Sequence, residues 1–335
     1  MRSRAYPTAS SRMKGDKMLR YLAGLLLAFF SWCPAWAQGT YPSKPITFVV
    51  CCNGLPEAVS RALADEIGKF SGQSIIVQSK PGVNGSLAAA YVARSVPDGY
   101  TVLIGTSSTH AANQSLYKKL PYDFVHDFVP ISGISKGYLG LIVRQDLPVS
   151  NLSEFIALAK RSPGQLTFGY ASSSVRAGAE LLAQMTGVKF RGISYKTNPQ
   201  AAIDLSGGRI DFMTSELLTA TSVVASGKAR ILAVSSPKRI STMPNVPTVE
   251  EAGVPGYELS FWLGAWVPAK TSSAIVKRLN GLFVQALASP KVQKFLETGA
   301  GSEAFPTTSD ELMKFQLAEK DKWHRILSAA GIQPQ

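Results

Sequence analysis

The sequence predicts an α/β protein made of two units, each a mostly parallel sheet flanked by helices, and three observations carry this prediction. The 335 residues are 45% hydrophobic and 17% charged, which is an ordinary globular composition. Short apolar runs alternate with longer runs of helical periodicity, as in parallel strands joined by helices. This alternation occurs twice, and further helices follow it, so the last helices are free to return to the first unit.

The elements are assigned in chain order from length and apolar period. In the first unit, strands are expected at 46–50, 74–78 and 101–105, with helices at 57–70 and 85–95. In the second unit, strands are expected at 141–143, 166–170, 191–195, 210–214 and 230–235, with helices at 152–161, 177–186 and 199–206. After the proline-rich segment 237–255, helices are expected at 274–288, 291–298 and 309–330.

The N-terminus has the pattern of a secretory signal peptide. Lys17 and Arg20 precede the apolar run Leu22–Phe30, and Ala35-Trp36-Ala37 has small residues at the positions that signal peptidase reads. We therefore expect cleavage after Ala37 and a soluble periplasmic product, because the run is shorter than a membrane span. Met18 is an alternative start. A lipid anchor on Cys33 is disfavoured because Trp32 precedes it.

Charge and cysteine content narrow the function classes. Cleavage removes six basic residues and one acidic residue, so the formal net charge falls from +13 to +8. The positive charges are scattered, which argues against nucleic acid and favours an anionic small molecule or solubility alone. Adjacent Cys51 and Cys52 would close a strained ring, so a structural disulfide is not expected, and unreactive thiols are favoured over a redox role. No protein-built metal site or cofactor is expected.

Ligands of such sheets bind beyond the carboxyl ends of strands, where loops lead into helix N-termini. Four loops have this position, and they are Cys51–Pro56, Thr106–Asn113, Ala171–Arg176 and Thr214–Leu217. The second and third are rich in hydroxyls, and Glu216 is the only acidic residue in any of the four loops. These loops suit a carboxylate, although Ser and Thr also cap helices.

Several strings, in the same order along the chain, resemble one family. They are Tyr41-Pro-Ser-Lys-Pro-Ile46, Pro97-Asp-Gly-Tyr-Thr101, Leu116-Tyr-Lys-Lys-Leu-Pro-Tyr-Asp123, Leu205-Ser-Gly-Gly-Arg-Ile-Asp211 and Pro244-Asn-Val-Pro-Thr-Val-Glu-Glu-Ala-Gly253. With them, residues 41–335 resemble the receptors of tripartite tricarboxylate transporters, the Bug-type periplasmic solute-binding proteins.

The resemblance implies a two-lobed clamp that closes around a ligand by a hinge motion. Lobe 1 would comprise 38–142 and 262–335, and lobe 2 would comprise 143–261. The chain would cross the hinge near Leu141–Gln145 and Ser260–Ala265. Function would be capture of a small carboxylate and delivery to membrane permease subunits, by a monomer and without a cofactor.

The candidate site joins residues matched to the family's loops with those proposed from the loop positions. The candidate ligand contacts are Asn53, Gly54, Thr106, Ser107, Ser108, Thr109, His110, Ala171, Ser172, Ser173, Ser174, Arg176, Thr214 and Ser215. For His110, bracing of its loop is favoured over a hydrogen bond to the ligand. Arg176 is either a bidentate partner of a carboxylate or a solvated surface arginine.

Three departures from the family's pattern bear on the ligand. The loop Cys51–Pro56 is shorter and has a single glycine, and the loop Ser173–Arg176 is also shortened. Where amino-acid-binding members tend to carry an acid, this chain has Ser215, so a carboxylate without an amine is favoured. Glu216 takes the acid's place if the register slips by one residue.

Other functions remain open beside transport. A co-receptor that presents a ligand to a sensor kinase would use the same clamp, and a degenerate paralogue would bind no small molecule. Catalysis is disfavoured, because the closeness of Ser108 and His110 in one loop does not supply the geometry that a nucleophile, its base and an orienting acid require. The sequence also has no nucleophile elbow, and Gly82-Val-Asn-Gly85 is not a phosphate loop.

Overall fold

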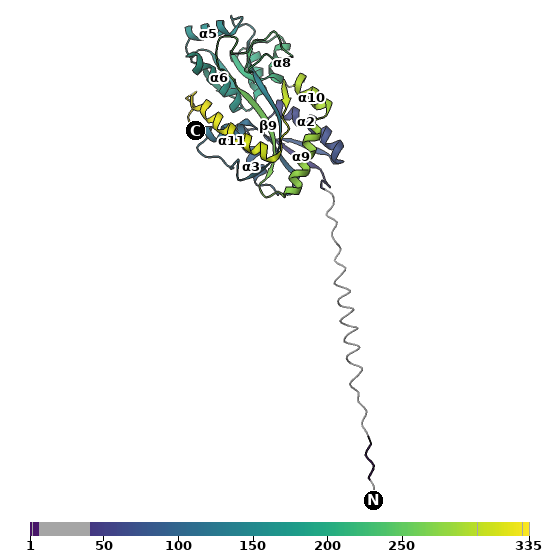
Figure 1. Cartoon of the computed structure of the whole chain (residues 1–335). Helices are drawn as coiled ribbons and strands as arrows, with labels where there is room; N and C mark the ends of the chain where they lie inside the picture. The colour runs from purple at the N-terminus through teal and green to yellow at the C-terminus, as the bar shows by residue number, and fades with distance from the viewer. Residues whose placement is uncertain (2, 7–40, 300, 330, 335) are drawn as a thin grey trace. The chain divides into compact units, whose positions relative to one another are not determined.

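The structure is a computed structural model that describes residues 1, 3–6, 41–299, 301–329 and 331–334 (Figure 1). Pro42–Gln335 forms one compact folded unit. The predicted signal peptide lies outside the described residues, apart from 1 and 3–6, which form no helix or strand. In the described part of the chain, no helix combines the length and apolar character needed to cross a membrane.

The first half of the folded unit alternates strands and helices as predicted. Its elements are β1 (Ile46–Val50), α2 (Leu55–Ser71), β2 (Ile75–Ser79), η1 (Val83–Gly85), α3 (Ser86–Ala93), β3 (Thr101–Thr106), η2 (Ser108–Ala112) and α4 (Asn113–Leu116). Strand β1 lies between β2 and β3 and pairs with both in parallel. The carboxyl ends of these three strands therefore meet at one edge.

The second half repeats this arrangement. Its elements are α5 (Leu152–Arg161), β5 (Thr167–Tyr170), α6 (Ser173–Thr186), β6 (Arg191–Ser194), α7 (Asn198–Ser206), β7 (Phe212–Glu216), α8 (Leu217–Ala225) and β8 (Ala229–Val234). Strand β5 pairs in parallel with β6 and β7. Aromatic side chains from α5, β5 and β7 fill this half's core, where the rings of Phe155 and Phe212 lie 4.9 Å apart.

Two long strands join the parallel groups. Strand β9 (Ser260–Pro268) pairs antiparallel with β3 and with β4 (Phe128–Arg144). Strand β4 pairs with β9 over Phe128–Tyr138 and with β7 over Leu139–Val143, so its partner changes within one continuous strand. The sheet order is β2-β1-β3-β9-β4-β7-β5-β6. The predicted hinge crossings fall on β4 and β9.

Most of β4 is not predicted by the sequence pattern, because glycines interrupt its alternation. At Gly137 a Cβ atom would lie 2.6 Å from the Phe261 ring of β9 and 2.9 Å from Ser302 Cβ. Only glycine leaves room here for the Phe261 ring and the Ser302 side chain. The predicted strand 141–143 is thus the end of a 17-residue strand, and β9, α8 and β10 (Ser302–Ala304) were not predicted as elements.

The last helices are α9 (Ser273–Leu287), α10 (Pro290–Lys294), η3 (Phe295–Gly299) and α11 (Ser309–Ala329). Helix α9 packs against α2 and β4, and α11 packs against β4, η2 and α6. Figure 1 shows α11, in yellow, between α6 and α3 in the view. The indole N–H of Trp262 donates to Glu319 Oε2 at 2.9 Å and that of Trp266 to Gln316 Oε1 at 3.0 Å, which ties α11 to β9.

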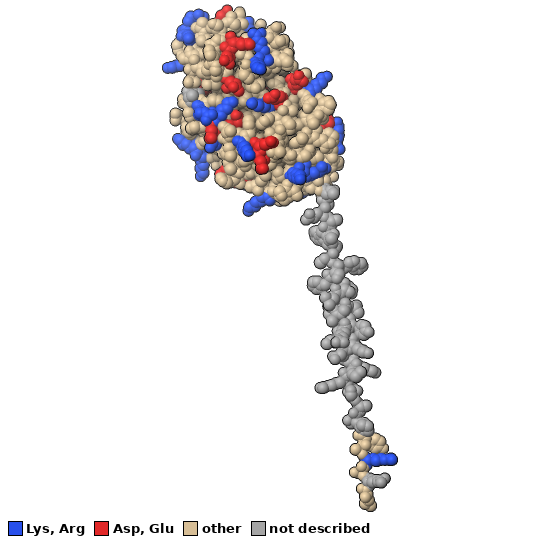
Figure 2. Space-filling model, in the orientation of Figure 1, with Lys and Arg blue, Asp and Glu red and all other residues tan. Residues whose placement is uncertain are grey.

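The charged residues are distributed without a single-sign field on the face seen in Figure 2. Lys and Arg side chains alternate with Asp and Glu side chains across the folded unit. This mixture matches the scattered charge of the sequence and gives no continuous basic stripe on this face for a polyanion.

Candidate functional site

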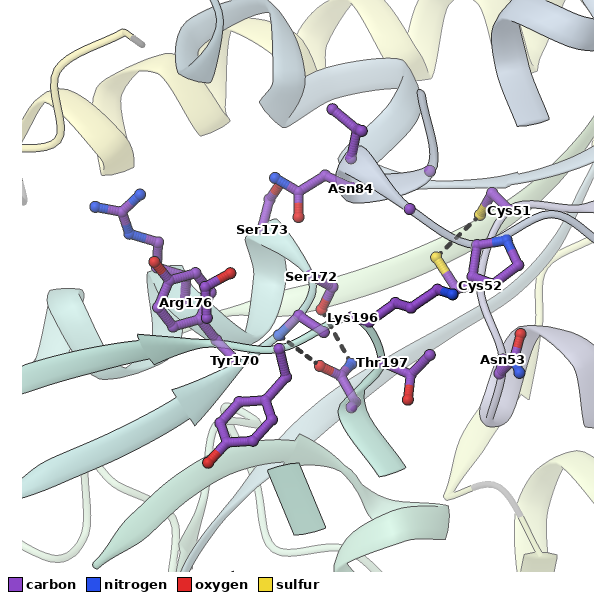
Figure 3. Close-up of a pocket in the computed structure, with 18 of the residues that line it drawn as sticks. Cys51, Cys52, Asn53, Asn84, Tyr170, Ser172, Ser173, Arg176, Lys196 and Thr197 are labelled. Carbon is purple, nitrogen blue, oxygen red and sulfur yellow. Dashed lines mark hydrogen bonds between the residues drawn. The ribbon is translucent and has the colours of Figure 1, made fainter. Parts of the chain in front are cut away.

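A cavity of about 200 Å³ lies where strands from both halves end. Its walls are the loops at the carboxyl ends of β1, β2, β5 and β6, together with the end of α4 (Figure 3). Its lining includes Cys52, Asn84, Tyr170, Ser172, Arg176 and Lys196. A smaller hollow of about 20 Å³ shares Cys52, Asn53, Ser172 and Asn198 with this cavity and reaches the ends of β3 and β7.

The structure brings most of the sequence-predicted residues to these two spaces. The large cavity is lined by Asn53, Ala171, Ser172, Ser173 and Arg176. The hollow is lined by Asn53, Thr106, Ser107, Ser108, Ser172 and Ser174. Neither space is lined by Gly54, Thr109, His110, Thr214 or Ser215. These latter residues lie behind the walls or next to them.

Gly54 and Thr214 position backbone segments near the cavity. Gly54 has φ +86°, and a Cβ there would lie 3.6 Å from Pro199 of α7, so the β1–α2 loop meets the second half at this point. Thr214 Oγ1 donates to the carbonyl of Val175 at 2.6 Å, which holds the first turn of α6 against β7.

His110 is buried and braces its loop. Its ring stacks on Trp266, with centroids 3.7 Å apart and planes 15° apart. Its Nδ1 lies 2.9 Å from Thr109 Oγ1, whose hydroxyl donates to the carbonyl of Thr106 at 3.0 Å. Because the Thr109 hydroxyl donates its proton to the Thr106 carbonyl, it accepts a hydrogen bond from the imidazole. We therefore assign the imidazole proton to Nδ1. Burial lowers the pKa of His110 to about 3, so the ring is neutral.

The β2–α3 turn forms one wall and has an unusual backbone. Gly82, Val83, Asn84 and Gly85 all have positive φ, with φ +49° at the β-branched Val83. Such a conformation is strained for a non-glycine residue and persists only when its surroundings hold it. Here Asn84 Nδ2 donates to the hydroxyl of Tyr117 at 2.9 Å, and the Asn84 carbonyl accepts from the side chain of Asn113 at 3.1 Å.

Asn113 links this turn to the opposite wall. Its side chain is fully buried and donates to Asn84 O and to Ser86 Oγ, at 3.1 and 3.2 Å. Its Oδ1 accepts from Ser173 Oγ at 3.1 Å, and Ser173 begins α6 in the second half. One amide therefore joins the strained turn to the start of α6.

The N-terminus of α6 faces the cavity beside Arg176. Ser172 caps the helix by accepting from Val175 N, and the first N–H groups of a helix lack intrahelical acceptors. The Arg176 guanidinium lies 5.4 Å from the centre of the Tyr170 ring and 3.6 Å from Glu180 Oε1, measured from Nε. The side chain is 22% exposed, so Arg176 is a half-buried part of the cavity wall and not a fully solvated surface arginine.

Several wall residues are not among the candidates that the sequence predicts. Asn84 and Tyr117 come from the first half, whereas Lys196, Thr197 and Asn198 follow β6. Asn198 Oδ1 accepts from Ala171 N at 2.9 Å, and its Nδ2 donates to Ser172 Oγ at 3.2 Å. The signal was present, because strands at 74–78 and 191–195 were predicted and their following loops obey the same carboxyl-end rule.

Glu216, and not Ser215, faces the hollow. Ser215 is fully buried, whereas Glu216 lines the hollow and accepts from Asn198 Nδ2 at 3.3 Å through both carboxylate oxygens. Burial raises the pKa of the Glu216 carboxyl. The acid beside the hollow is therefore Glu216, which lies one residue after the position, Ser215, at which the family's acid was expected.

Cys51 and Cys52 are both free and lie in the cavity wall. Their sulfur atoms are 3.3 Å apart. The pKa of the Cys52 thiol is raised, mainly by the hydrogen bond with Cys51 and to a smaller extent by burial. Among the described residues, no group of three or more His, Cys, Asp or Glu side chains gathers in a way that could hold a metal ion.

Comparisons with known proteins identify the family of this chain. The family described as "Tripartite tricarboxylate transporter family receptor" matches residues 59–332. The chain belongs to this receptor family. BugT from Bordetella pertussis is 30% identical over 325 residues, which cover 94% of this chain and 98% of BugT.

Two solved structures resemble the receptor over most of its length. Rpa4515 of R. palustris, solved with adipate, has 31% identity and a TM-score of 0.86, covering 88% of this chain and 100% of that one. MatC from Rhodopseudomonas palustris, solved with bound malate, has 29% identity and a TM-score of 0.80, covering 86% and 100%. The α/β clamp fold of periplasmic solute-binding proteins is thus confirmed for this receptor.

Proposed function

We propose that this receptor binds a small organic carboxylate in the large cavity, in the periplasm, and delivers it to the membrane permease subunits of a tripartite transporter. One observation carries the proposal. The cavity lining includes two cationic side chains, Arg176 and Lys196, and no Asp or Glu. A carboxylate there gains charge-assisted hydrogen bonds and the partial positive charge of the α6 N-terminus.

The size of the cavity supports a small ligand. Its volume of about 200 Å³ lies below the roughly 300 to 1,000 Å³ of sites for drug-sized molecules. The adipate and malate bound to the two similar structures are acids of this size class. Capture and release require no chemical step, so no catalytic group is assigned.

A ligand without an amine is expected from Ser215, which cannot pair with an ammonium group. Glu216, which lines the hollow, is an acid that could pair with one. A buried carboxylate beside the cavity is the group that an ammonium would pair with. The hollow at Glu216 has room for about one atom, since a water needs roughly 10 to 15 Å³. We therefore propose a carboxylate ligand, and the effect of an amine on its affinity is to be measured.

The test is a binding panel on the receptor purified from the periplasm. It contains malate, adipate and a tricarboxylate, together with succinate and aspartate, which differ only in the amine. A ligand at about 100 times its dissociation constant adds roughly 2.7 kcal/mol of apparent stability, which a thermal shift detects. Calorimetry then gives the affinity. A flat response to every acid contradicts the proposal and favours a paralogue that binds no small molecule.

Arg176→Ala tests the site within the same panel. Loss of a charge-assisted hydrogen bond costs about 1.5 to 3 kcal/mol, or roughly 10- to 100-fold in affinity. Arg209→Ala is the matched control, because Arg209 is exposed and paired with Asp204 outside the cavity lining. Equal affinities of wild type and Arg176→Ala would remove Arg176 from the site.

Closure belongs to the proposal as well. We expect 38–142 with 262–335 to move against 143–261 about β4 and β9, in a monomer. Small-angle scattering should give a smaller radius of gyration with ligand, at unchanged mass. A receptor that also docks on a sensor kinase would close in the same way, so capture of the closed form by permease subunits or by a kinase sensor domain separates these two partners.

A further inference from the structure

Two adjacent thiols form part of the cavity wall and take no part in the proposed carboxylate grip. Cys51 and Cys52 follow β1 directly, and their sulfurs face each other at 3.3 Å (Figure 3). Cys52 is half-buried and lines both the cavity and the hollow, whereas Cys51 is buried. A reagent that enters the cavity therefore meets Cys52 first and finds Cys51 within reach.

This pair resists conversion to a disulfide. Adjacent residues joined by a trans peptide have Cα atoms about 3.8 Å apart, whereas disulfides usually span at least about 4.4 Å. The raised pKa of Cys52 also keeps the thiolate fraction low, and thiolate is the form that attacks a disulfide. We therefore expect the pair to remain a dithiol in an oxidising compartment.

Two sulfurs at this separation match a single bridging atom. With bonds of about 2.3 Å, as thiolates make to zinc, and a bond angle near a right angle, two sulfurs on one atom lie about 3.3 Å apart. Trivalent arsenic is pyramidal with such angles. From the sulfur geometry in the cavity wall we infer that Cys51 and Cys52 form a binding site for a thiophilic trivalent arsenical.

The reaction needs no oxidant. An organic arsenic(III) oxide and the two thiols give a cyclic dithioarsenite and one water. Two sulfur–arsenic bonds form, the arsenic–oxygen bond breaks, and both thiol protons leave with the oxygen. Arsenic stays trivalent and sulfur keeps its oxidation state. Because the protons are consumed in making water, the raised pKa of Cys52 does not block this reaction, whereas it slows alkylation, which needs the thiolate.

A metal ion is a poorer match for the pair. Structural zinc takes four ligands, and among the described residues no third Cys, His, Asp or Glu joins these thiols in such a group. An aryl arsenical needs only the two sulfurs and retains its organic group as the third substituent. That group would project into the cavity, which Lys196 of the β6–α7 loop also lines.

The test uses phenylarsine oxide and the receptor secreted from its complete coding sequence. Intact-mass spectrometry under native conditions should show one phenylarsenic group per chain. The adduct should survive excess glutathione, a monothiol, and be released by 2,3-dimercaptopropanol, a dithiol. Iodoacetamide under the same conditions should label the native receptor much more slowly than the urea-unfolded one. The mass of the untreated chain also reports whether Cys33 has been removed.

Cys52→Ser and Cys51→Ala are the deciding variants, each checked for a native thermal transition. Both should lose the glutathione-resistant adduct, because one thiol cannot chelate. The inference is overturned if native wild type gains no arsenic, if either single variant retains the resistant adduct, or if the untreated chain is already lighter by the two hydrogens of a disulfide.

A separate arm asks whether the adduct blocks carboxylate binding, which it should if the aryl group fills the cavity. This arm rests on the proposed function, whereas the mass measurements do not. An adduct formed on a receptor that binds no carboxylate would therefore count against the proposed function alone.

Discussion

His110 should make the receptor less stable as the pH falls below about 6.5, and His110→Phe should remove this dependence. The neutral ring is stacked on Trp266, and no hydrogen-bond partner of its Nε2 is found in the described structure. Protonation would leave a charge in this apolar position, which is why the pKa lies at about 3. Between pH 3 and 6.5 the unfolded chain therefore binds more protons than the folded one, so stability falls with falling pH.

The magnitude follows from the two pKa values. Well below its unfolded pKa of about 6.5, the group removes about 1.4 kcal/mol of stability for each pH unit. From pH 7 to pH 5 the loss is about 2 kcal/mol by the same linkage relation. Phenylalanine preserves the stack on Trp266 but cannot be protonated, so its variant should lack this part of the loss.

Urea unfolding followed by tryptophan fluorescence, at pH 7 and pH 5, measures the effect. His126→Gln is the matched control, because His126 is exposed and its pKa is raised by Asp123. That variant should lose at least as much stability as wild type between pH 7 and pH 5, since the folded state favours the protonated form of His126 and this contribution partly offsets the loss in wild type. An equal pH dependence in wild type and His110→Phe would refute the assignment of His110 as a buried neutral brace.

Three further predictions concern the cavity walls. Ser173→Ala removes the hydrogen bond to Asn113, so ligand release measured by stopped flow should be about 2- to 10-fold faster. The ligand-free clamp should also be more open by small-angle scattering, and an unchanged ligand-free form would count against this link. Gly85→Ala places a Cβ 2.7 Å from Thr109 Cγ2 at φ +83°, so it should lower the free energy of unfolding in urea by about 2 to 4 kcal/mol. Gly72→Ala, at φ +69° with no atom near the new Cβ, should lower it by only about 1 to 2 kcal/mol. Equal losses would contradict the crowding at Gly85. Glu216→Gln removes a buried carboxyl with a raised pKa, so unfolding free energy should rise at pH 8 relative to wild type and much less at pH 4; a loss at pH 8 would show that the ionised group is stabilised.

Local pattern was sufficient for the elements whose period is regular. The strand at 46–50 and the helix at 152–161 have the same bounds in the structure. The hydroxyl-rich loops after β3 and β5 reach the cavity or the hollow because the carboxyl ends of parallel strands share an edge.

Long-range contacts decided the features that the local sequence pattern does not show. Strand β4 carries glycines where β9 and β10 pass close by, so its sequence lacks the alternation of an isolated strand. Lys196 and Asn198 join the site because β6 pairs with β5, a pairing between residues far apart in the chain.

The residues by themselves determined the α/β class, the family resemblance and the polar, anion-suited character of the loops, because these depend on composition, period and short motifs. Only the tertiary structure decided which side chains face the cavity. A side chain's direction depends on strand register, and a shift of one residue reverses it. That is why Glu216, at the end of β7, lines the hollow while its neighbour Ser215 does not. His110 lies in η2, and the packing of this element on β9 places its ring on Trp266.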